Sequence, residues 1–247
     1  MQGVVNDERR MTIVEHLEEL RRVLIVSLAA WFACTVVAFI FNGFVLGLLL
    51  RPLKLVLGNL HSIVPGAIFT SPTEGISVPI KIATIIGFIL ALPVILWQVW
   101  SFVSPGLRPV ERKFVGPFIA SAILLFACGA AFAYFVMPLG LGFLAGFLGG
   151  NAVYFPDIDQ YLSFFLLLVV IFGVTFEMPV VLVLLGSLRI ISSQWLRRRR
   201  KVAIVIIIAA AAIVTPGADP FTPTALAIPL LLLYEASILV LAKIMHR

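Results

Sequence analysis

The chain has 247 residues, of which 62% are hydrophobic and only 12% are charged, and its mean hydropathy is +1.14. A soluble protein of this length needs a far more polar surface, so the composition excludes that class and predicts an all-α integral membrane protein. The formal net charge of +6 would also fit a nucleic-acid-binding protein, and the positions of the basic residues decide between these two explanations.

The polar first 22 residues carry an amphipathic pattern. Four apolar residues fall on one helical face while the acidic residues lie off it: Ile13, Leu17, Leu20 and Leu24. We expect residues 1–22 to form a cytoplasmic amphipathic helix that continues into a first span at residues 23–50, where 28 positions carry no charge. This run is too long for the hydrophobic region of a secretory signal, so we expect no cleavable signal peptide.

Five further apolar runs complete a single transmembrane domain that we expect to cover residues 1–247. The predicted spans are 78–99, 114–137, 160–188, 202–214 and 224–241. Residues 51–77 and 138–157 are expected to be loops, because Gly, Pro and other turn-forming residues cluster there. The fifth run, residues 202–214, would form only about 20 Å of helix, which is shorter than an average bilayer.

Six spans place both termini on one side of the membrane, and the basic residues identify that side. Of the 18 Lys and Arg residues, 15 fall in the two termini and in the loops that follow the second and fourth spans. This is the positive-inside pattern, so both termini are expected to be cytoplasmic. The run Arg197–Lys201 is interpreted as part of this orientation signal, and no nucleic acid partner is expected.

Two carboxylates lie within predicted spans. Glu177 is the only charge in residues 160–188, and a carboxylate at bilayer depth costs at least about 2.5 kcal/mol. Pro179 should kink the same helix, because proline lacks a backbone donor. Glu177 either fixes helix packing as a protonated or hydrogen-bonded residue, or faces a groove or hydrated cavity where a ligand binds. A transporter or channel that uses Glu177 and Glu235 also stays open, although no internal repeat favours it.

Motifs for catalysis are absent from the sequence. There is no GxxxxGK[ST] phosphate-binding loop, and the HLEEL segment at His16 lacks the second histidine of a HExxH zinc site. There is also no GxSxG nucleophile elbow. We therefore expect no enzyme, no metal and no cofactor.

Five ordered motifs between about residue 12 and residue 242 resemble the TatC family of the twin-arginine protein translocase. They are HLEELRR (16–22), SFVSPGL followed by VERK (101–113), FAYFVMPL (132–139), YLSFFLLLVVIFGVTFEMPV (161–180) and ALAIPLLLLYE (225–235). The resemblance implies six transmembrane helices in a cupped-hand arrangement, with short fifth and sixth helices, in the cell (plasma or inner) membrane.

The resemblance also implies partners and a function. A core receptor of this kind binds Arg-Arg signal peptides of folded cargo proteins and assembles with TatA- and TatB-type single-span subunits. It also contacts other TatC copies and membrane lipids. The proton-motive force would drive export.

Individual residues match positions of the family motifs. The signal-peptide-binding positions are Glu19, Arg21, Phe102, Pro105 and Glu111. The other matches are the polar residues Glu177, Asp219 and Glu235 and the first-loop proline Pro52, and Pro179 is expected to be structural. Glu19 and Glu111 suit the chemistry, because a carboxylate forms paired, charge-assisted bonds with a guanidinium. The alternatives are a solvated helix face for Glu19 and a local partner, Arg108 or Lys113, for Glu111.

Overall fold

The structure is a computed structural model that describes residues 13–59, 67–103, 115–147, 156–187, 190–214 and 220–245. Its helices are α1 (Ile13–Ile40), α2 (Asn42–Asn59), α3 (Glu74–Val103), α5 (Val115–Phe147), α6 (Ile158–Phe176), α7 (Met178–Ser187), α8 (Ser193–Arg198), α9 (Arg200–Val214) and α10 (Phe221–Met245). In the described residues five stretches are long and apolar enough to cross a membrane: α1, α3, α5, α6 with α7, and α10. The chain is therefore an all-helical, multi-pass membrane protein with five to six helices of spanning length.

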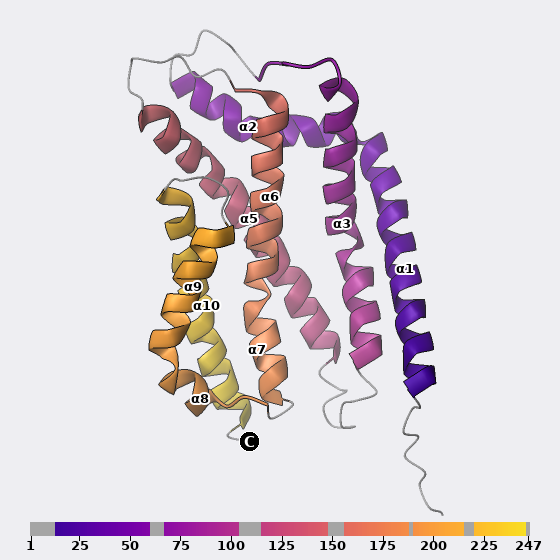
Figure 1. Ribbon diagram of the computed structural model, residues 1–247, viewed down its shortest axis with the longest axis vertical. Coiled ribbons are helices and arrows are strands. Elements are labelled where there is room, and N and C mark those ends of the chain that lie inside the picture. Colours follow the sequence, from indigo (N-terminus) through magenta and orange to yellow (C-terminus); the bar gives the residue numbers. More distant parts are fainter. Residues whose placement is uncertain are drawn as a thin grey trace, which may run out of the picture.

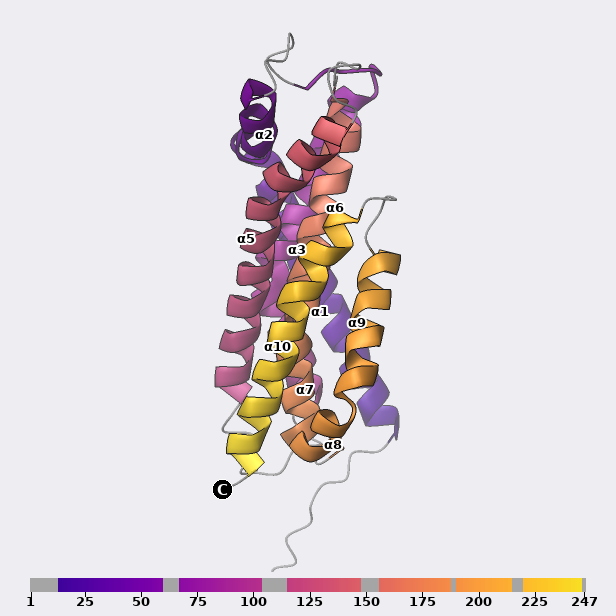
Figure 2. The same ribbon diagram turned by 90° about the vertical axis from the view of Figure 1, so that its left-hand side faces the viewer.

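The helices form a layer in which neighbours along the chain mostly lie side by side (Figure 1). α1 packs against α3, α3 packs against α6, and α10 lies between α7 and α9. α5 packs on α6 and crosses behind it, as Figure 2 shows from the side. The start of α1, the end of α3, α8 and the end of α10 all lie at the lower end of the molecule in Figure 1. These segments and the connections beside them carry most of the basic residues, which the sequence predicted to lie on one side of the membrane.

The first apolar run does not form the single span predicted at residues 23–50. α1 begins at Ile13 and ends at Ile40, and after a turn at Phe41 the chain continues as α2, which runs across the top of the molecule in Figure 1. Asn42 and Gly43 follow the turn, and both residue types favour a change of backbone direction over a continuing helix. α2 reaches Asn59, so the first part of the predicted loop 51–77 is helical.

Other boundaries also differ from the prediction. α5 extends to Phe147 through Pro138, so the beginning of the predicted loop 138–157 is helical; prolines are tolerated in membrane helices where neighbouring groups satisfy the freed backbone. α10 has 25 residues, which corrects the expectation of a short sixth helix. α9 has 15 residues and is short, as predicted.

Glycines allow two pairs of helices to approach closely. A Cβ on Gly87 of α3 would overlap the backbone of Thr35 in α1. A Cβ on Gly129 of α5 would lie 2.5 Å from the carbonyl oxygen of Phe172 in α6. Helix association in membranes depends on such close packing, because lipid removes the hydrophobic driving force between helices.

Two tyrosines join α2 to the rest of the bundle. Pro52 is buried within α2 and has no N–H, so the carbonyl of Leu48, four residues earlier, lacks its usual helical donor. The hydroxyl of Tyr134 in α5 donates to this carbonyl at 3.2 Å. The hydroxyl of buried Tyr161 in α6 donates to the neighbouring Leu49 carbonyl at 2.7 Å. The proline predicted in a loop thus lies in a helix, where neighbouring side chains compensate for its missing donor.

Candidate functional site

Two of the family-like motifs meet at the lower end of the molecule. The imidazole of His16 in α1 stacks on the ring of Phe102 in α3, with ring centroids 4.2 Å apart and an angle of 15° between the planes. The HLEELRR segment begins α1 and the SFVSPGL segment ends α3, so the α1–α3 packing brings them together. Pro105 and Glu111 lie outside the described residues.

Glu19 lies beside this stack with part of its carboxylate unpaired. Its side chain is 24% exposed, and Oε2 lies 4.0 Å from Nδ1 of His16, which is too long for a hydrogen bond. The same oxygen is buried and has no hydrogen-bond partner in the described part of the chain. A buried acceptor without a donor is destabilising by about 1–3 kcal/mol. Glu19 is therefore a carboxylate with one oxygen, Oε2, that accepts no hydrogen bond within the described structure.

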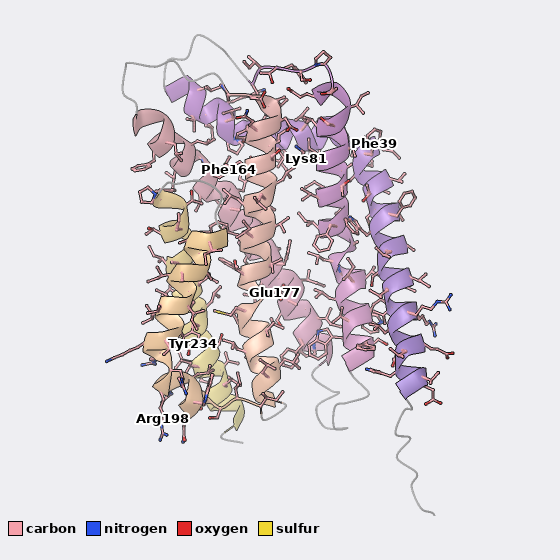
Figure 3. All side chains as sticks on the ribbon, in the orientation of Figure 1. Phe39, Lys81, Phe164, Glu177, Arg198 and Tyr234 are labelled. Atoms are coloured by element: carbon pink, nitrogen blue, oxygen red, sulfur yellow. The ribbon has the colours of Figure 1, made fainter. Side chains whose placement is uncertain are left out.

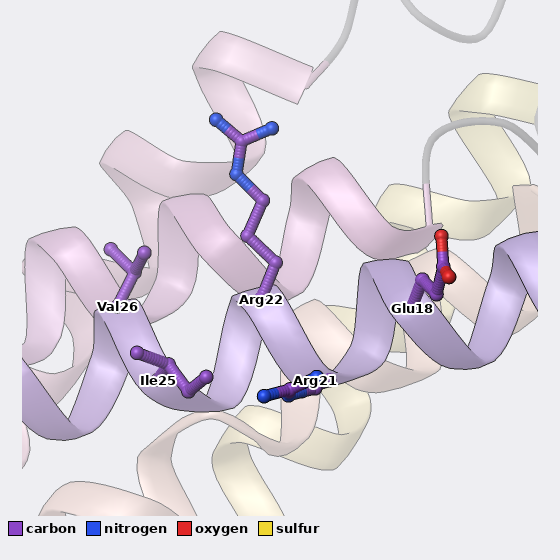
Figure 4. Close-up of a pocket in the computed structure, with 5 residues that line it drawn as sticks. All are labelled: Glu18, Arg21, Arg22, Ile25 and Val26. Atoms are coloured by element: carbon purple, nitrogen blue, oxygen red, sulfur yellow. The ribbon is translucent and has the colours of Figure 1, made fainter.

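Arg21 lies on a different part of the α1 surface. A groove of about 300 Å³ is lined by Glu18, Arg21, Arg22, Ile25 and Val26. Figure 4 shows the Arg22 side chain extending from one side of α1 and Arg21 lying with Ile25 on another. Among the described residues no ion pair joins Arg21 to Glu19. The prediction that Glu19 and Arg21 act in the same site therefore does not rest on an ion pair between them.

Glu177 interrupts the central helix. α6 ends at Phe176 and α7 begins at Met178, so the break lies two residues before Pro179. The Glu177 N–H donates to Val174 at 3.1 Å, which is a tighter turn than an α-helix makes. The hydroxyl of Thr175 donates back to the carbonyl of Ile171 at 2.7 Å, a bond that often bends helices.

The carboxylate of Glu177 is positioned at this break, near the middle of the molecule's length (Figure 3). Its Oε1 is buried without a hydrogen-bond partner among the described residues. Within that part of the chain only three other buried side-chain polar atoms lack a partner: Oε2 of Glu19, Oγ of Ser27 and Oδ1 of Asn42. Glu19 and Glu177, two of the carboxylates that the sequence analysis singled out, therefore each keep one oxygen without a hydrogen bond.

Glu235 is different, because it has a partner. Its Oε2 accepts a hydrogen bond from Nη2 of Arg200 at 2.6 Å, and both side chains are about half exposed. Next to it, the hydroxyl of buried Tyr234 donates to the carbonyl of Leu196 at 2.9 Å. These bonds attach α10 to α8 and to the start of α9. The described contacts form no relay between Glu177 and Glu235. Asp219 lies outside the described residues.

Sequence reasoning missed a polar cluster at the opposite end of the molecule. Nζ of Lys81 in α3 contacts Oδ1 of Asp159 at 2.5 Å and Oγ of Ser163 at 2.6 Å, both in α6. The sequence places Lys81 near the outer end of a span, but nothing beside it points to residues 78 and 82 positions later. Only the packing of α3 on α6 brings these side chains together.

The segment before α3 is attached to the start of α6 at this same end. Ile68 pairs with the backbone around Asp157, and buried Glu74 accepts a bond from the N–H of Ser71 at 2.8 Å. The Thr70 hydroxyl bonds to the Asp157 carboxylate, which also accepts from the Gln160 N–H at 2.8 Å. These two bonds, the hydroxyl first, lower the pKa of Asp157 below its usual value. Among the described residues no group of three or more His, Cys, Asp or Glu residues could hold a metal ion.

The comparisons with known proteins all identify the same family. The family model described as "Sec-independent protein translocase protein (TatC)" matches residues 15–229. The chain is 40% identical to the protein of that name from Carboxydothermus hydrogenoformans, over 95% of this chain and 94% of the relative. It is 43% identical to the one from Aquifex aeolicus, over 92% and 93%.

The fold agrees with solved structures of the same family. A crystal structure described as "Twin Arginine Translocase Receptor- TatC" is similar with a TM-score of 0.78 and 43% sequence identity, over 94% of this chain and all of that one. A second structure of such a receptor, in the detergent DDM, has a TM-score of 0.79 and 44% identity. The relatives and the solved structures thus match more than nine-tenths of the chain, and the family model matches residues 15–229. The chain belongs to the TatC family of Sec-independent protein translocase proteins and is a translocase subunit, not an enzyme.

Proposed function

We propose that this chain is the core receptor of a twin-arginine translocase and binds Arg-Arg signal peptides of folded proteins at the lower end in Figure 1. The observation that carries the proposal is the buried, unpaired Oε2 of Glu19 beside the His16–Phe102 stack. A signal-peptide arginine would supply the missing donor there. Glu111 and Pro105, which follow Phe102 in the chain, are proposed to complete the site, and Arg21 to act from the adjacent surface of α1.

The side of the membrane follows from the charges at that end. Arg21, Arg22 and Lys243 lie in segments that share the lower end with Arg197–Lys201. We propose that this end is cytoplasmic and that the protein resides in the cell membrane with both termini inside. A signal peptide from newly folded cargo would then reach the site directly.

Glu177 is proposed to act deeper in the membrane, on the concave face of a cupped-hand arrangement. Its unpaired oxygen and the helix break beside Pro179 offer a polar point to a helix that docks there, either the signal peptide or a TatA- or TatB-type subunit. A dry, unpaired carboxylate binds a donor more strongly than it would in water. The chain would assemble with those subunits and with further TatC copies, and the proton-motive force would then drive export.

A binding measurement without any ion gradient tests the receptor proposal. Glu19→Gln should weaken an Arg-Arg peptide by about ten- to a hundredfold, since losing a charged hydrogen bond typically costs about 1.5–3 kcal/mol. Glu18→Gln removes the same charge from an exposed neighbouring position and should have a much smaller effect.

A Lys-Lys peptide separates geometry from charge in the same experiment. Arginine presents a planar fork to a carboxylate, whereas lysine is a mobile point charge. The Lys-Lys peptide should bind weakly to the wild type and lose little more in Glu19→Gln. If Glu19→Gln weakened both peptides by the same factor, or Glu18→Gln matched its effect, the carboxylate would supply only a diffuse field and the proposed site would be wrong.

A further inference from the structure

The corner between α8 and α9 is a fixed structure built on α10. The Ser192 hydroxyl accepts from the Trp195 N–H at 3.1 Å and caps α8. Leu196 is buried, and its carbonyl accepts the hydroxyl of Tyr234. The Arg200–Glu235 ion pair holds the first turn of α9 to α10. Because three separate contacts hold this corner, the side chains around it are presented in a defined arrangement.

The charges of this corner are mostly uncompensated. Of the five consecutive cations at residues 197–201, Arg200 is neutralised by Glu235 at 2.6 Å. Arg197, Arg198, Arg199 and Lys201 are exposed, and in the described part of the chain none of these four forms an ion pair. Figure 3 shows Arg198 at the lower end of the molecule, pointing away from the bundle.

Exposed apolar side chains lie next to these cations. Trp195 is 50% exposed, and the guanidinium of Arg199 lies 5.8 Å from its ring centroid. Ile190, just before the corner, and Val202, just after it, are also exposed. A row of cations beside an exposed tryptophan and aliphatic side chains is typical of a surface at the headgroup level of a membrane.

We infer that the surface formed by Trp195, Arg197, Arg198, Arg199 and Lys201 is a binding site for the headgroup of an anionic phospholipid. The cations would attract the negatively charged headgroup, and Trp195 would lie at the boundary between headgroup and acyl chain. A signal peptide is a poor alternative, because its own arginine pair would be repelled by four uncompensated cations. An orientation signal alone requires positive charge but neither a capped helix nor an ion pair that fixes the corner.

Photo-crosslinking with matched lipids tests this inference. The full-length protein is reconstituted in phosphatidylcholine vesicles that contain a photoactivatable phosphatidylglycerol or a photoactivatable phosphatidylcholine with the same acyl chains. Crosslinks are then mapped by proteolysis, with no signal peptide present. We expect phosphatidylglycerol to be enriched over phosphatidylcholine at residues 195–201. Each neutralised cation should lower that enrichment about fivefold.

The variants separate a built site from general surface charge. Arg197→Gln with Arg198→Gln should abolish most of the enrichment, while Arg197→Lys with Arg198→Lys should keep it because the charges remain. Arg51→Gln with Lys54→Gln removes two exposed cations of α2 at the opposite end and should leave it unchanged. Equal crosslinking of both lipids in the wild type, or equal losses in the two glutamine pairs, would overturn the inference. Signal-peptide binding is measured separately, so the receptor proposal can fail without affecting this result.

Discussion

Restoring the backbone N–H that Pro52 lacks should make the hydrogen bond from Tyr134 to Leu48 dispensable for stability. In the structure the Tyr134 hydroxyl donates to the Leu48 carbonyl at 3.2 Å, and this carbonyl lacks a helical donor because residue 52 is proline. Tyr134→Phe removes this side-chain donor from the carbonyl. Pro52→Ala supplies an N–H at the position from which an α-helix donates to Leu48. We therefore predict that the two substitutions are strongly coupled.

The expected magnitude follows from burial and distance. Hydrogen bonds between membrane helices contribute about 0.6 kcal/mol on average and up to about 1.7 kcal/mol. The Tyr134 bond is long and partly exposed, so Tyr134→Phe should lower the free energy of unfolding by roughly 0.5 kcal/mol. In the Pro52→Ala background the loss should be close to zero. Tyr161 is buried and its bond to Leu49 is 2.7 Å, so Tyr161→Phe should cost about 1–2 kcal/mol.

Tyr161→Phe also serves as the internal control, because the carbonyl that it leaves is not the one that Pro52 deprives of a donor. Its cost should be the same in the wild-type and Pro52→Ala backgrounds. The free energies come from reversible unfolding in mixed micelles, followed by circular dichroism, in a double-mutant cycle. If Tyr134→Phe cost as much in the Pro52→Ala background as in the wild type, the hydroxyl would not be compensating for the proline.

Three further predictions concern packing, pH and the central carboxylate. Gly87→Val should destabilise the bundle by about 1–3 kcal/mol through overpacking. Gly43→Val should destabilise it less, because no atom lies within 4 Å of the added Cβ. Equal melting temperatures of the two variants would contradict the close approach of α1 and α3 at Gly87. The lowered pKa of Asp157 means that its stabilising contribution is present above its usual pKa and is lost as the pH falls towards the folded value. Thr70→Val, which removes the main cause, should therefore move acid-induced loss of stability to higher pH, and an unchanged acid midpoint would show that this bond has no effect. Glu177→Gln should insert and fold but impair export. Glu177→Leu should impair export more, because leucine cannot form the hydrogen bonds that the glutamine amide still forms. Normal export by the Leu variant would show that Glu177 is a packing residue only.

Hydropathy and charge determine much of this protein without any structure. Long apolar runs can be stable only as membrane helices, and clusters of basic residues at alternate connections indicate their orientation. Two single residues also stood out in the sequence. Glu177 did so because a carboxylate is costly in an apolar span, and Glu19 because it is a carboxylate in a motif that resembles one family. Such features are local, so the sequence displays them directly, and family membership followed from the order of the motifs.

Tertiary structure decided what depends on contacts between distant residues. The turn at Phe41 lies inside one continuous apolar run, because the residues of α1 and α2 on either side of it are apolar. Hydropathy therefore cannot mark where the chain turns. Glu235 is paired because the α8–α9 corner packs on α10 and brings Arg200 to it. Lys81 meets Asp159 across 78 positions only because α3 packs on α6. A carboxylate's role depends on which donors reach it, and that is a property of helix packing rather than of the residues beside it in the chain.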